Sequence, residues 1–351
     1  MGYSDLLGKL CAINDKLQDE ESKIIFEARV NYLFTRREEE YYKVIQKVNS
    51  QAQCGELNDF LEDNIGYDGI VIVGIGEEGI RTKRLLDICN KPPQLFCDLN
   101  GDIFTEEIEG LKVISISQLI KDYKSWVVIL TDREVLAESY SRLLRDGFPR
   151  RKILYPMYSH LVGSNGIQYF DVFTPLEDEV FIDAGSYNGD TIREFINWNG
   201  GDYKKIYAFE PNEDMFTVLK EYVDDEQLSN VSLLQMATWN GMEDLEFTND
   251  ASASRIEKSG TTIVKAVDID SVVGDEKVTY IKMDVEGSEL QSLMGAKETI
   301  CRDKPRLAIS VYHKDDDILI LSDYILSLNP EYKLLLRQYN TNFWETVLYA
   351  F

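Results

Sequence analysis

Histidine, cysteine and basic residues are scarce in this sequence. Of its 351 residues, two are histidines and five are cysteines, and no two cysteines form a C-x-x-C pair. A histidine-rich metal centre is therefore excluded by number, and a structural zinc site is disfavoured. Reduced, mostly buried thiols are expected instead, as in a cytoplasmic protein.

Long apolar runs are also missing. No stretch approaches the roughly 20 apolar residues that a membrane span needs, and charge interrupts the segment Met1–Gln18. We therefore expect neither a signal peptide nor a membrane anchor, and we expect a cytoplasmic location.

The net charge restricts the partners of the protein. The 37 basic and 62 acidic residues give a formal charge of −25. Such a surface repels the phosphate backbone of nucleic acids, so a nucleic acid is not expected as the substrate. A small molecule or a glycan, bound in a locally basic pocket, remains open as the substrate.

The pattern along the chain predicts an α/β protein with two Rossmann-like domains. Residues 1–65 show helical periodicity and contain no catalytic motif, which indicates a scaffold or a dimer surface. A dimer surface would make the protein a homo-oligomer. A small Rossmann-like domain is predicted over 66–168, with a linker at 163–166. The second domain, 169–351, alternates strands and helices and closes with an antiparallel pair, so its sheet is expected to be mostly parallel. A polar loop is predicted at 249–260.

A glycine pattern stands in the first domain. Gly69–Gly79 reads as a strand followed by G-x-G-x-x-G, and Asp98 lies 24 positions after Gly74. This resembles a dinucleotide site in outline. However, Glu77 and Glu78 would oppose a pyrophosphate, and tight packing of a helix on a strand explains the glycines equally. Packing is the favoured interpretation.

The stretch Val180–Thr191 organises the second domain. A short apolar run ends at Asp183, a loop containing Gly185 and Gly189 follows, and a helical pattern begins at Thr191. A strand, a glycine turn and a helix start together form a ligand cradle. Glu210 ends the next predicted strand, 27 positions after Asp183, where an acid can accept hydrogen bonds from the ribose of a nucleoside.

Further polar residues end further apolar runs. In open α/β sheets, ligands bind beyond the carboxyl ends of the strands. Asp284 and Glu286 follow one run and His313 follows another. Ionisable groups gathered at one sheet edge are costly without a ligand or ion, so this cluster predicts a functional site, although a helix-capping role for Glu286 stays open.

These motifs resemble one family. From about residue 169 onward, the chain is similar to the FkbM-type methyltransferases of the class I, S-adenosylmethionine-dependent group. The matching stretches are VFIDAGSYNGDT, YAFEPN, YIKMDVEGSE with MGA, KPRLAISVYHK and ETVLYA. The resemblance implies a seven-stranded sheet with an antiparallel hairpin and methylation of a hydroxyl, often on a sugar or a secondary metabolite. Gln338 stands where the family commonly has histidine, which leaves the acceptor open.

The resemblance also implies the roles of single residues. Glu210 is expected to accept the ribose hydroxyls of S-adenosylmethionine. The other implied cofactor contacts are with the methionine end, by Asp183, Gly185, Asn188 and Gly189, and with the adenine, by Met236 and Ala237.

An alcohol is a poor nucleophile until its proton is removed, so a base is needed. The candidates are Asp284 and His313, with Lys282 and Glu286 fixing orientation. In a variant of this hypothesis, Asp284, Glu286 and His313 bind an ion such as Mg²⁺, which acidifies the hydroxyl.

Two rival functions remain at this point. In the first, the second domain binds a nucleoside without catalysis, and the first domain, which resembles the nucleotide-sugar-binding domains of bacterial sugar acyltransferases, recognises a partner or a sugar nucleotide. In the second, the glycine pattern after Gly69 binds NAD for an oxidoreductase.

Overall fold

A computed structural model describes residues 3–53, 60–88, 90–98, 107–131, 136–154, 168–248, 255–256, 262–340 and 343–351. The chain forms two compact units, 1–41 with 166–339 and 343–351, and 42–165 with 340–342. This division places the first 41 residues with the carboxyl-terminal domain, which differs from the predicted boundary at residue 65. The predicted linker at 163–166 lies outside the described residues, as does the loop at 249–260 except for Arg255–Ile256.

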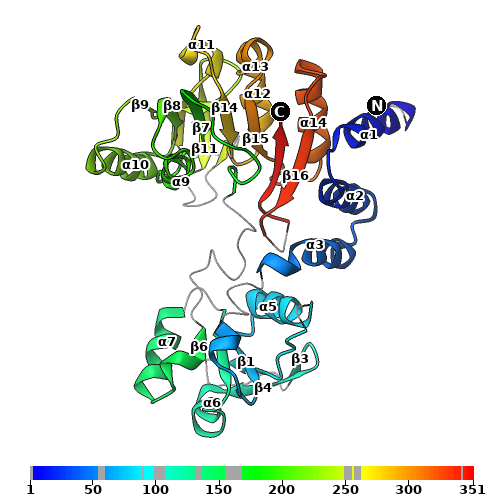
Figure 1. The fold of residues 1–351 in the computed structure, drawn as a ribbon, viewed down its shortest axis with the longest axis vertical. Helices are drawn as coiled ribbons and strands as arrows, with labels where there is room; N and C mark the ends of the chain where they lie inside the picture. Colours follow the sequence, from blue (N-terminus) through cyan, green and yellow to red (C-terminus); the bar gives the residue numbers. More distant parts are fainter. Residues whose placement is uncertain are drawn as a thin grey trace. The chain divides into compact units, whose positions relative to one another are not determined.

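A seven-stranded sheet forms the core of the first unit (Figure 1). Its order is β16-β17-β15-β14-β7-β8-β9, and only β17 runs antiparallel to its neighbours. The bounds are β7 Glu179–Ala184, β8 Tyr203–Phe209, β9 Val231–Leu234, β14 Tyr280–Met283, β15 Arg306–Ser310, β16 Leu334–Gln338 and β17 Thr346–Ala350. The mostly parallel sheet and its terminal antiparallel hairpin confirm the predicted fold class.

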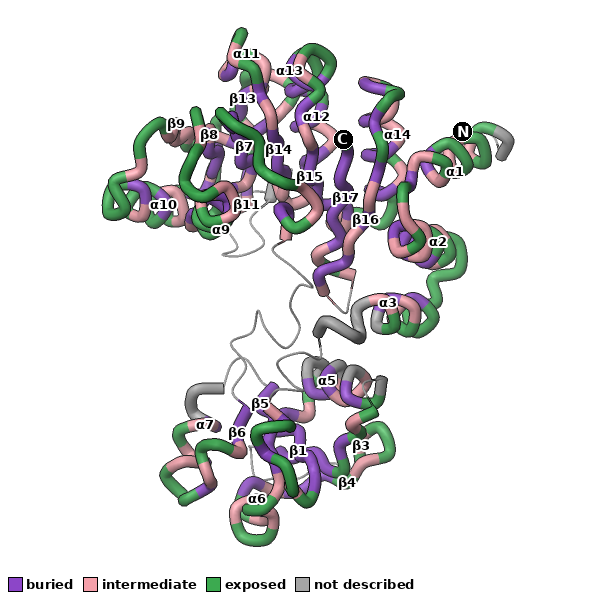
Figure 2. The backbone as a smooth tube through the Cα atoms, viewed as in Figure 1, coloured by how far each residue is buried: buried purple, intermediate pink, exposed green. Residues whose placement is uncertain are grey.

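The central strands are buried on both faces, as Figure 2 shows for β7, β14 and β17. Parallel strands covered on both sides are continuously apolar, which is why these segments were recognisable in the sequence. The helices along this part of the chain are α9 Asp190–Asn199, α10 Glu213–Asp225, α11 Ile269–Val273, α12 Glu289–Met294, α13 Lys297–Asp303 and α14 Asp317–Leu328.

One predicted helix is divided in two. The spacing of apolar residues after Ser288 predicts one continuous helix to about Ile300, whereas α12 ends at Met294 and α13 begins at Lys297. Gly295 lies at the break, where a Cβ atom would meet the backbone oxygen of Trp239 at 1.8 Å. The close approach of another segment of chain therefore requires glycine here.

A smaller sheet follows β9. It has the order β10-β13-β11-β12, with β10 Ala237–Thr238, β11 Glu243–Thr248, β12 Arg255–Ile256 and β13 Thr262–Val267. The turn-like residues 239–241 between two apolar stretches predict a hairpin over 237–247. This prediction is wrong, because β10 pairs parallel with β13 and β11 pairs antiparallel with β13. The strand at 262–267 was not anticipated.

Two amino-terminal helices, α1 Tyr3–Lys16 and α2 Glu20–Thr35, lie against the hairpin end of the large sheet (Figure 1). The buried Ser22 hydroxyl accepts a hydrogen bond from the Leu336 amide of β16 at 2.9 Å. Asp19 caps α2 and pairs with Arg337 at 2.6 Å. The third helix, α3, spans Glu38–Gln53.

The second unit contains a six-stranded sheet of order β3-β4-β2-β1-β5-β6, parallel except for β3. Its elements are β1 Ile70–Val73, α5 Glu77–Ile88, β2 Leu95–Asp98, β3 Glu107–Ile108, β4 Leu111–Ser115, α6 Ile116–Asp122, β5 Val127–Leu130, α7 Leu136–Arg145, a 3-10 turn Arg150–Lys152 and β6 Ile153–Leu154. A Cβ atom at Gly79 would meet the Gly74 oxygen at 2.1 Å, so packing of α5 on β1 accounts for this glycine.

Two expectations from the sequence, reduced cysteines and the lack of a membrane span, concern the described residues. Their cysteines, Cys11, Cys97 and Cys301, are free thiols. Among these residues, no helix combines the length and apolar character that a membrane crossing requires.

Candidate active site

The glycine loop after β7 is held by packing within the protein. Gly185 has φ 82°, and a Cβ atom there would lie 1.9 Å from the Asp284 backbone oxygen. Gly189 has φ 87°, and its added Cβ would lie 2.8 Å from the ring of Tyr222. Both glycines are therefore required by the fold itself, whatever the loop binds. Asn188 accepts a hydrogen bond from the Asp190 amide at 3.1 Å and so shapes the start of α9.

Asp183 lies beneath this loop rather than on its surface. Its side chain is fully buried, and Oδ1 lies 3.0 Å from Nζ of Lys282, which occupies the paired position on β14. Lys282 also donates a hydrogen bond to the Gly185 oxygen at 2.6 Å. Burial raises the pKa of Asp183 to about 6, although the charge of Lys282 acts to lower it. The pair thus ties the central strands to the loop.

Glu210 stands beside the same loop, just beyond the end of β8. Its Oε2 accepts a hydrogen bond from the Tyr187 amide at 2.9 Å, and Oε1 accepts one from the Asn212 amide at 2.7 Å. Burial raises the pKa of Glu210 to about 7, despite these hydrogen bonds, which favour the charged form. Met236 is half-buried and Ala237 is buried in β10, so both follow the end of the neighbouring strand β9.

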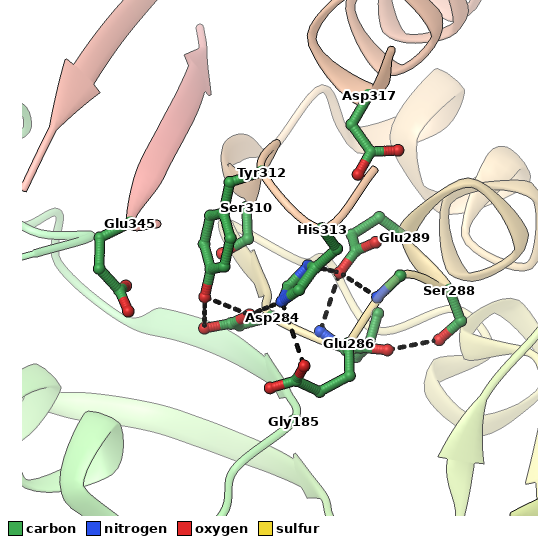
Figure 3. Close-up of polar contacts among 12 residues, drawn as sticks. Gly185, Asp284, Glu286, Ser288, Glu289, Ser310, Tyr312, His313, Asp317 and Glu345 are labelled. Atoms are coloured by element: carbon green, nitrogen blue, oxygen red, sulfur yellow. Dashed lines mark hydrogen bonds and ion pairs between the residues drawn. The ribbon is translucent and has the colours of Figure 1, made fainter. Parts of the chain in front are cut away.

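A second cluster follows β14 and β15. Figure 3 shows His313 between acidic side chains from the segment after β14. Its Nε2 lies 3.4 Å from Oδ1 of Asp284 and 3.5 Å from Oε2 of Glu286. Its Nδ1 lies 2.9 Å from Oε1 of Glu289, which also accepts hydrogen bonds from the amides of Val285 and Gly287. The structure therefore brings together three of the four predicted catalytic residues at this cluster.

Two tyrosines hold Asp284. The Tyr169 hydroxyl donates to Oδ2 at 2.7 Å, and the Tyr312 hydroxyl lies 3.3 Å from both oxygens. Burial would raise the pKa of Asp284, but the charges of His313 and Lys282 and the two hydroxyls outweigh it and lower that pKa. The neighbouring charges and hydroxyls thus favour the ionised form of the Asp284 carboxylate.

The imidazole and a further acid have raised pKa values. Burial acts to lower the pKa of His313, but the carboxylates of Glu289, Asp284 and Glu286 prevail and raise it to about 9. For Glu345, burial and then the charge of Asp284 raise the pKa to about 7, and Gln168 donates a hydrogen bond to it at 2.6 Å. The site therefore combines an ionised aspartate, a cationic imidazole and an acid that titrates near neutrality.

The family comparison matches the segment that contains both clusters. Residues 183–338 match the model of the methyltransferase FkbM domain. The segment 183–338 is therefore an FkbM methyltransferase domain. The matched segment begins at Asp183 and includes Glu210, Asp284 and His313.

Two solved structures similar to the chain are methyltransferases or methylases by name. An FkbM methyltransferase from Methylobacillus flagellatus KT is 20% identical, with 89% of this chain and 99% of that chain covered and a TM-score of 0.50. This similarity supports the fold. An rRNA methylase from Streptococcus thermophilus is 18% identical over 50% of this chain and 87% of its own, with a TM-score of 0.34. A comparison with curated proteins found no match.

Three residues of this candidate site were not singled out from the sequence. Tyr169 and Glu345 lie outside the matched segment, and Glu345 begins the ETVLYA stretch, to which no role was given. Glu289 belongs to the YIKMDVEGSE stretch, in which Ser288 precedes a helical pattern and is expected to cap it; the Ser288 side chain instead donates to the Val285 oxygen. Gln338 is buried; it accepts from Thr346 at 2.5 Å and donates to the Trp344 oxygen at 2.5 Å, so it stabilises the hairpin.

Proposed function

We propose that the protein is an S-adenosylmethionine-dependent O-methyltransferase acting on a hydroxyl of a sugar, a glycan or a small metabolite. One observation carries this proposal: the Glu210 carboxylate lies against the glycine loop, 2.9 Å from the Tyr187 amide, within an FkbM domain. An acid at this strand end accepts hydrogen bonds from the ribose of a bound nucleoside. The acidic surface supports a small or glycan acceptor over a nucleic acid.

The remaining cofactor contacts follow from the position of the loop. The backbone around Gly185, Asn188 and Gly189 would hold the methionine end of the cofactor. Asp183 acts from beneath as a positioning residue, because its buried pair with Lys282 fixes the Gly185 carbonyl. Met236 and Ala237 would flank the adenine. When bound, S-adenosylmethionine supplies an electrophilic methyl group on a sulfonium.

The chemistry required of the protein is positioning and removal of one proton. If S-adenosylmethionine is bound at the loop after β7, the protein would have to hold the acceptor oxygen in line with its methyl group. The hydroxyl proton must pass to a base, for which Asp284 and His313 are the candidates. Glu286 would orient His313, since its Oε2 lies 3.5 Å from Nε2.

Calorimetry with S-adenosylhomocysteine tests the cofactor. We expect Glu210→Gln to weaken binding at least tenfold, because an amide cannot replace the carboxylate for two ribose hydroxyls. Glu213→Gln, an exposed acid in the first turn of α10, is the matched control and should change binding less than twofold. Equal affinity in all three proteins would contradict the proposed ribose contact.

The same titration separates the rival functions. Binding of NAD alone would support an oxidoreductase, and binding of a UDP-sugar without transferase activity would support a binding module. A labelled-methyl screen against glycans, nucleotide sugars and small hydroxylated metabolites, with Asp183→Ala as the blank, would identify the acceptor. A chain that binds S-adenosylhomocysteine but methylates nothing in a broad screen would favour the non-catalytic alternative.

A further inference from the structure

Three side chains of the second cluster converge on one point. Carboxylate oxygens of Asp284 and Glu286 and a ring nitrogen of His313 all lie within 4.8 Å of one another.

We propose that Asp284, Glu286 and His313 bind a divalent first-row transition-metal ion, through one oxygen of each carboxylate and Nε2 of the imidazole. The distances between the ligand atoms suit such an ion. Two ligands at about 2.1 Å from one tetrahedral ion lie ~3.4 Å apart, and Nε2 lies 3.4 Å and 3.5 Å from the two carboxylate oxygens.

The imidazole provides an observation independent of the acids. The His313 side chain is only 6% exposed, yet within the described part of the chain its Nε2 makes no hydrogen bond. Its Nε2 faces the gap between Asp284 and Glu286 (Figure 3). A buried nitrogen without a hydrogen bond is costly, and a metal ion would satisfy it.

Glu289 completes the arrangement typical of a metal-binding histidine. Ligating histidines usually present their other ring nitrogen to a carboxylate or carbonyl, which fixes the ring and its tautomer. Here Nδ1 lies 2.9 Å from Oε1 of Glu289. Glu289 is itself fixed, since its side chain is 1% exposed and Oε1 accepts two backbone hydrogen bonds. By holding Nδ1, Glu289 thus orients Nε2 of His313 toward the proposed ion.

The ligand set decides the class of ion. Magnesium takes oxygen ligands and keeps much of its water, whereas an imidazole nitrogen suits manganese, iron, cobalt and zinc. A set of one nitrogen and two carboxylates therefore points away from the Mg²⁺ expected from the sequence. The site itself rests on geometry alone. Its role, acidifying the acceptor hydroxyl, rests on the proposed methyltransferase function.

Manganese binding tests the site directly. The full chain, stripped with EDTA and exchanged into chelator-free buffer, is titrated with MnCl₂ while free Mn²⁺ is followed by electron paramagnetic resonance. We expect one Mn²⁺ per chain and an affinity at least tenfold higher than that for Mg²⁺, measured by competition. Failure to bind Mn²⁺ stoichiometrically, or equal affinity for the two ions, would overturn the proposal.

Three variants locate the ion. Glu286→Gln and His313→Ala should each weaken Mn²⁺ binding at least tenfold. Glu213→Gln, which removes an exposed acid in the first turn of α10, is the control and should change affinity less than threefold. The Glu286 side chain is 32% exposed, so Glu286→Gln is decisive even if the histidine variant fails to fold. Unchanged affinity in Glu286→Gln would refute the assigned ligands.

Calorimetry with S-adenosylhomocysteine on the same preparations separates the two proposals. A chain that binds S-adenosylhomocysteine but not Mn²⁺ refutes the metal site and leaves the proposed methyltransferase intact. A chain that binds Mn²⁺ at the named ligands but not S-adenosylhomocysteine retains the metal site and refutes the proposed cofactor.

Discussion

Lys282 places its ammonium 3.0 Å from a carboxylate oxygen of Asp183 in the centre of the FkbM sheet, where the two side chains are 2% and 0% exposed. The pair occupies facing positions on β14 and β7. Because Lys282 also donates to the Gly185 carbonyl, the ion pair extends from the core to the proposed cofactor loop. The stability of the sheet and the shape of the loop therefore depend on the same lysine.

Lys282→Met should destabilise the protein by about 3–5 kcal/mol, because it leaves the buried Asp183 charge without a partner. The double variant Asp183→Asn with Lys282→Met should recover part of this loss. Urea unfolding measures both. Lys304→Met, which breaks an exposed pair with Glu331, is the control and should leave the unfolding midpoint unchanged. Equal losses in the single and double variants would show that the pair is not coupled.

Binding of S-adenosylhomocysteine should strengthen as the pH rises through about 7, the pKa of Glu210. Below this pH, Glu210 is protonated and loses acceptor capacity, so the apparent affinity falls with the ionised fraction, roughly tenfold between pH 8 and pH 6. The free energy of unfolding changes in the opposite direction. Because the pKa of Glu210 is raised in the folded protein, Glu210 keeps a proton there that it loses in the unfolded chain. The contribution of Glu210 to stability therefore falls as the pH rises from about 4.5 to 7. Calorimetry at both pH values is the measurement, and Glu210→Gln should abolish this part of the dependence.

Gly185→Ala should destabilise the protein more than Gly200→Ala, although both glycines have a positive φ, of 82° and 71°. An added Cβ at Gly185 would meet the Asp284 oxygen at 1.9 Å, whereas nothing lies within 4 Å of one at Gly200. Gly200→Ala is the control, because it should lose only the about 1 kcal/mol that an alanine costs in this backbone conformation. The difference in melting temperature between the two variants therefore measures the effect of the clash with the Asp284 oxygen. Equal shifts would mean that the loop can move away, and S-adenosylhomocysteine binding should then be preserved.

Tyr169→Phe should lower the rate of methyl transfer about tenfold while leaving the affinity for S-adenosylhomocysteine within twofold. The variant removes the 2.7 Å hydrogen bond to Asp284, and hydrogen bonds to charged groups contribute about 1.5–3 kcal/mol. Tyr312→Phe, which removes longer contacts of 3.3 Å, should have a smaller effect. Initial rates with the acceptor found in the screen provide the test, and an unchanged rate in Tyr169→Phe would exclude a role in holding Asp284.

Ser22→Ala should destabilise the first unit by about 1–3 kcal/mol, since the Leu336 amide would lose its buried acceptor. The exposed hydroxyl of Ser327, which donates to the Tyr324 oxygen, offers a control in Ser327→Ala. Thermal unfolding compares the two. If Ser22→Ala behaves like the control, α2 does not stabilise the hairpin edge of the sheet.

The strands and loops of the FkbM domain were predictable because their signals are local. Short apolar runs lie within β7, β8 and β14, and the glycines mark the turn after β7. Predictions from local sequence were wrong where contacts with segments far away in the sequence decide the structure. The carbonyl of Trp239 requires glycine at position 295 and divides a predicted helix, and β11 pairs with β13, whose sequence gave no expectation of a strand.

The sequence by itself determined which polar residues end the strands of this protein, since a buried strand must become polar where it leaves the sheet. Only the tertiary structure decided what those residues contact. The order of β14 beside β7 pairs Lys282 with Asp183, and the adjacent end of β15 brings His313 to Asp284 and Glu286. Tyr169, far away in sequence, reaches the same aspartate. Such contacts depend on the crossover connections between parallel strands, and residue spacing along the chain does not encode them.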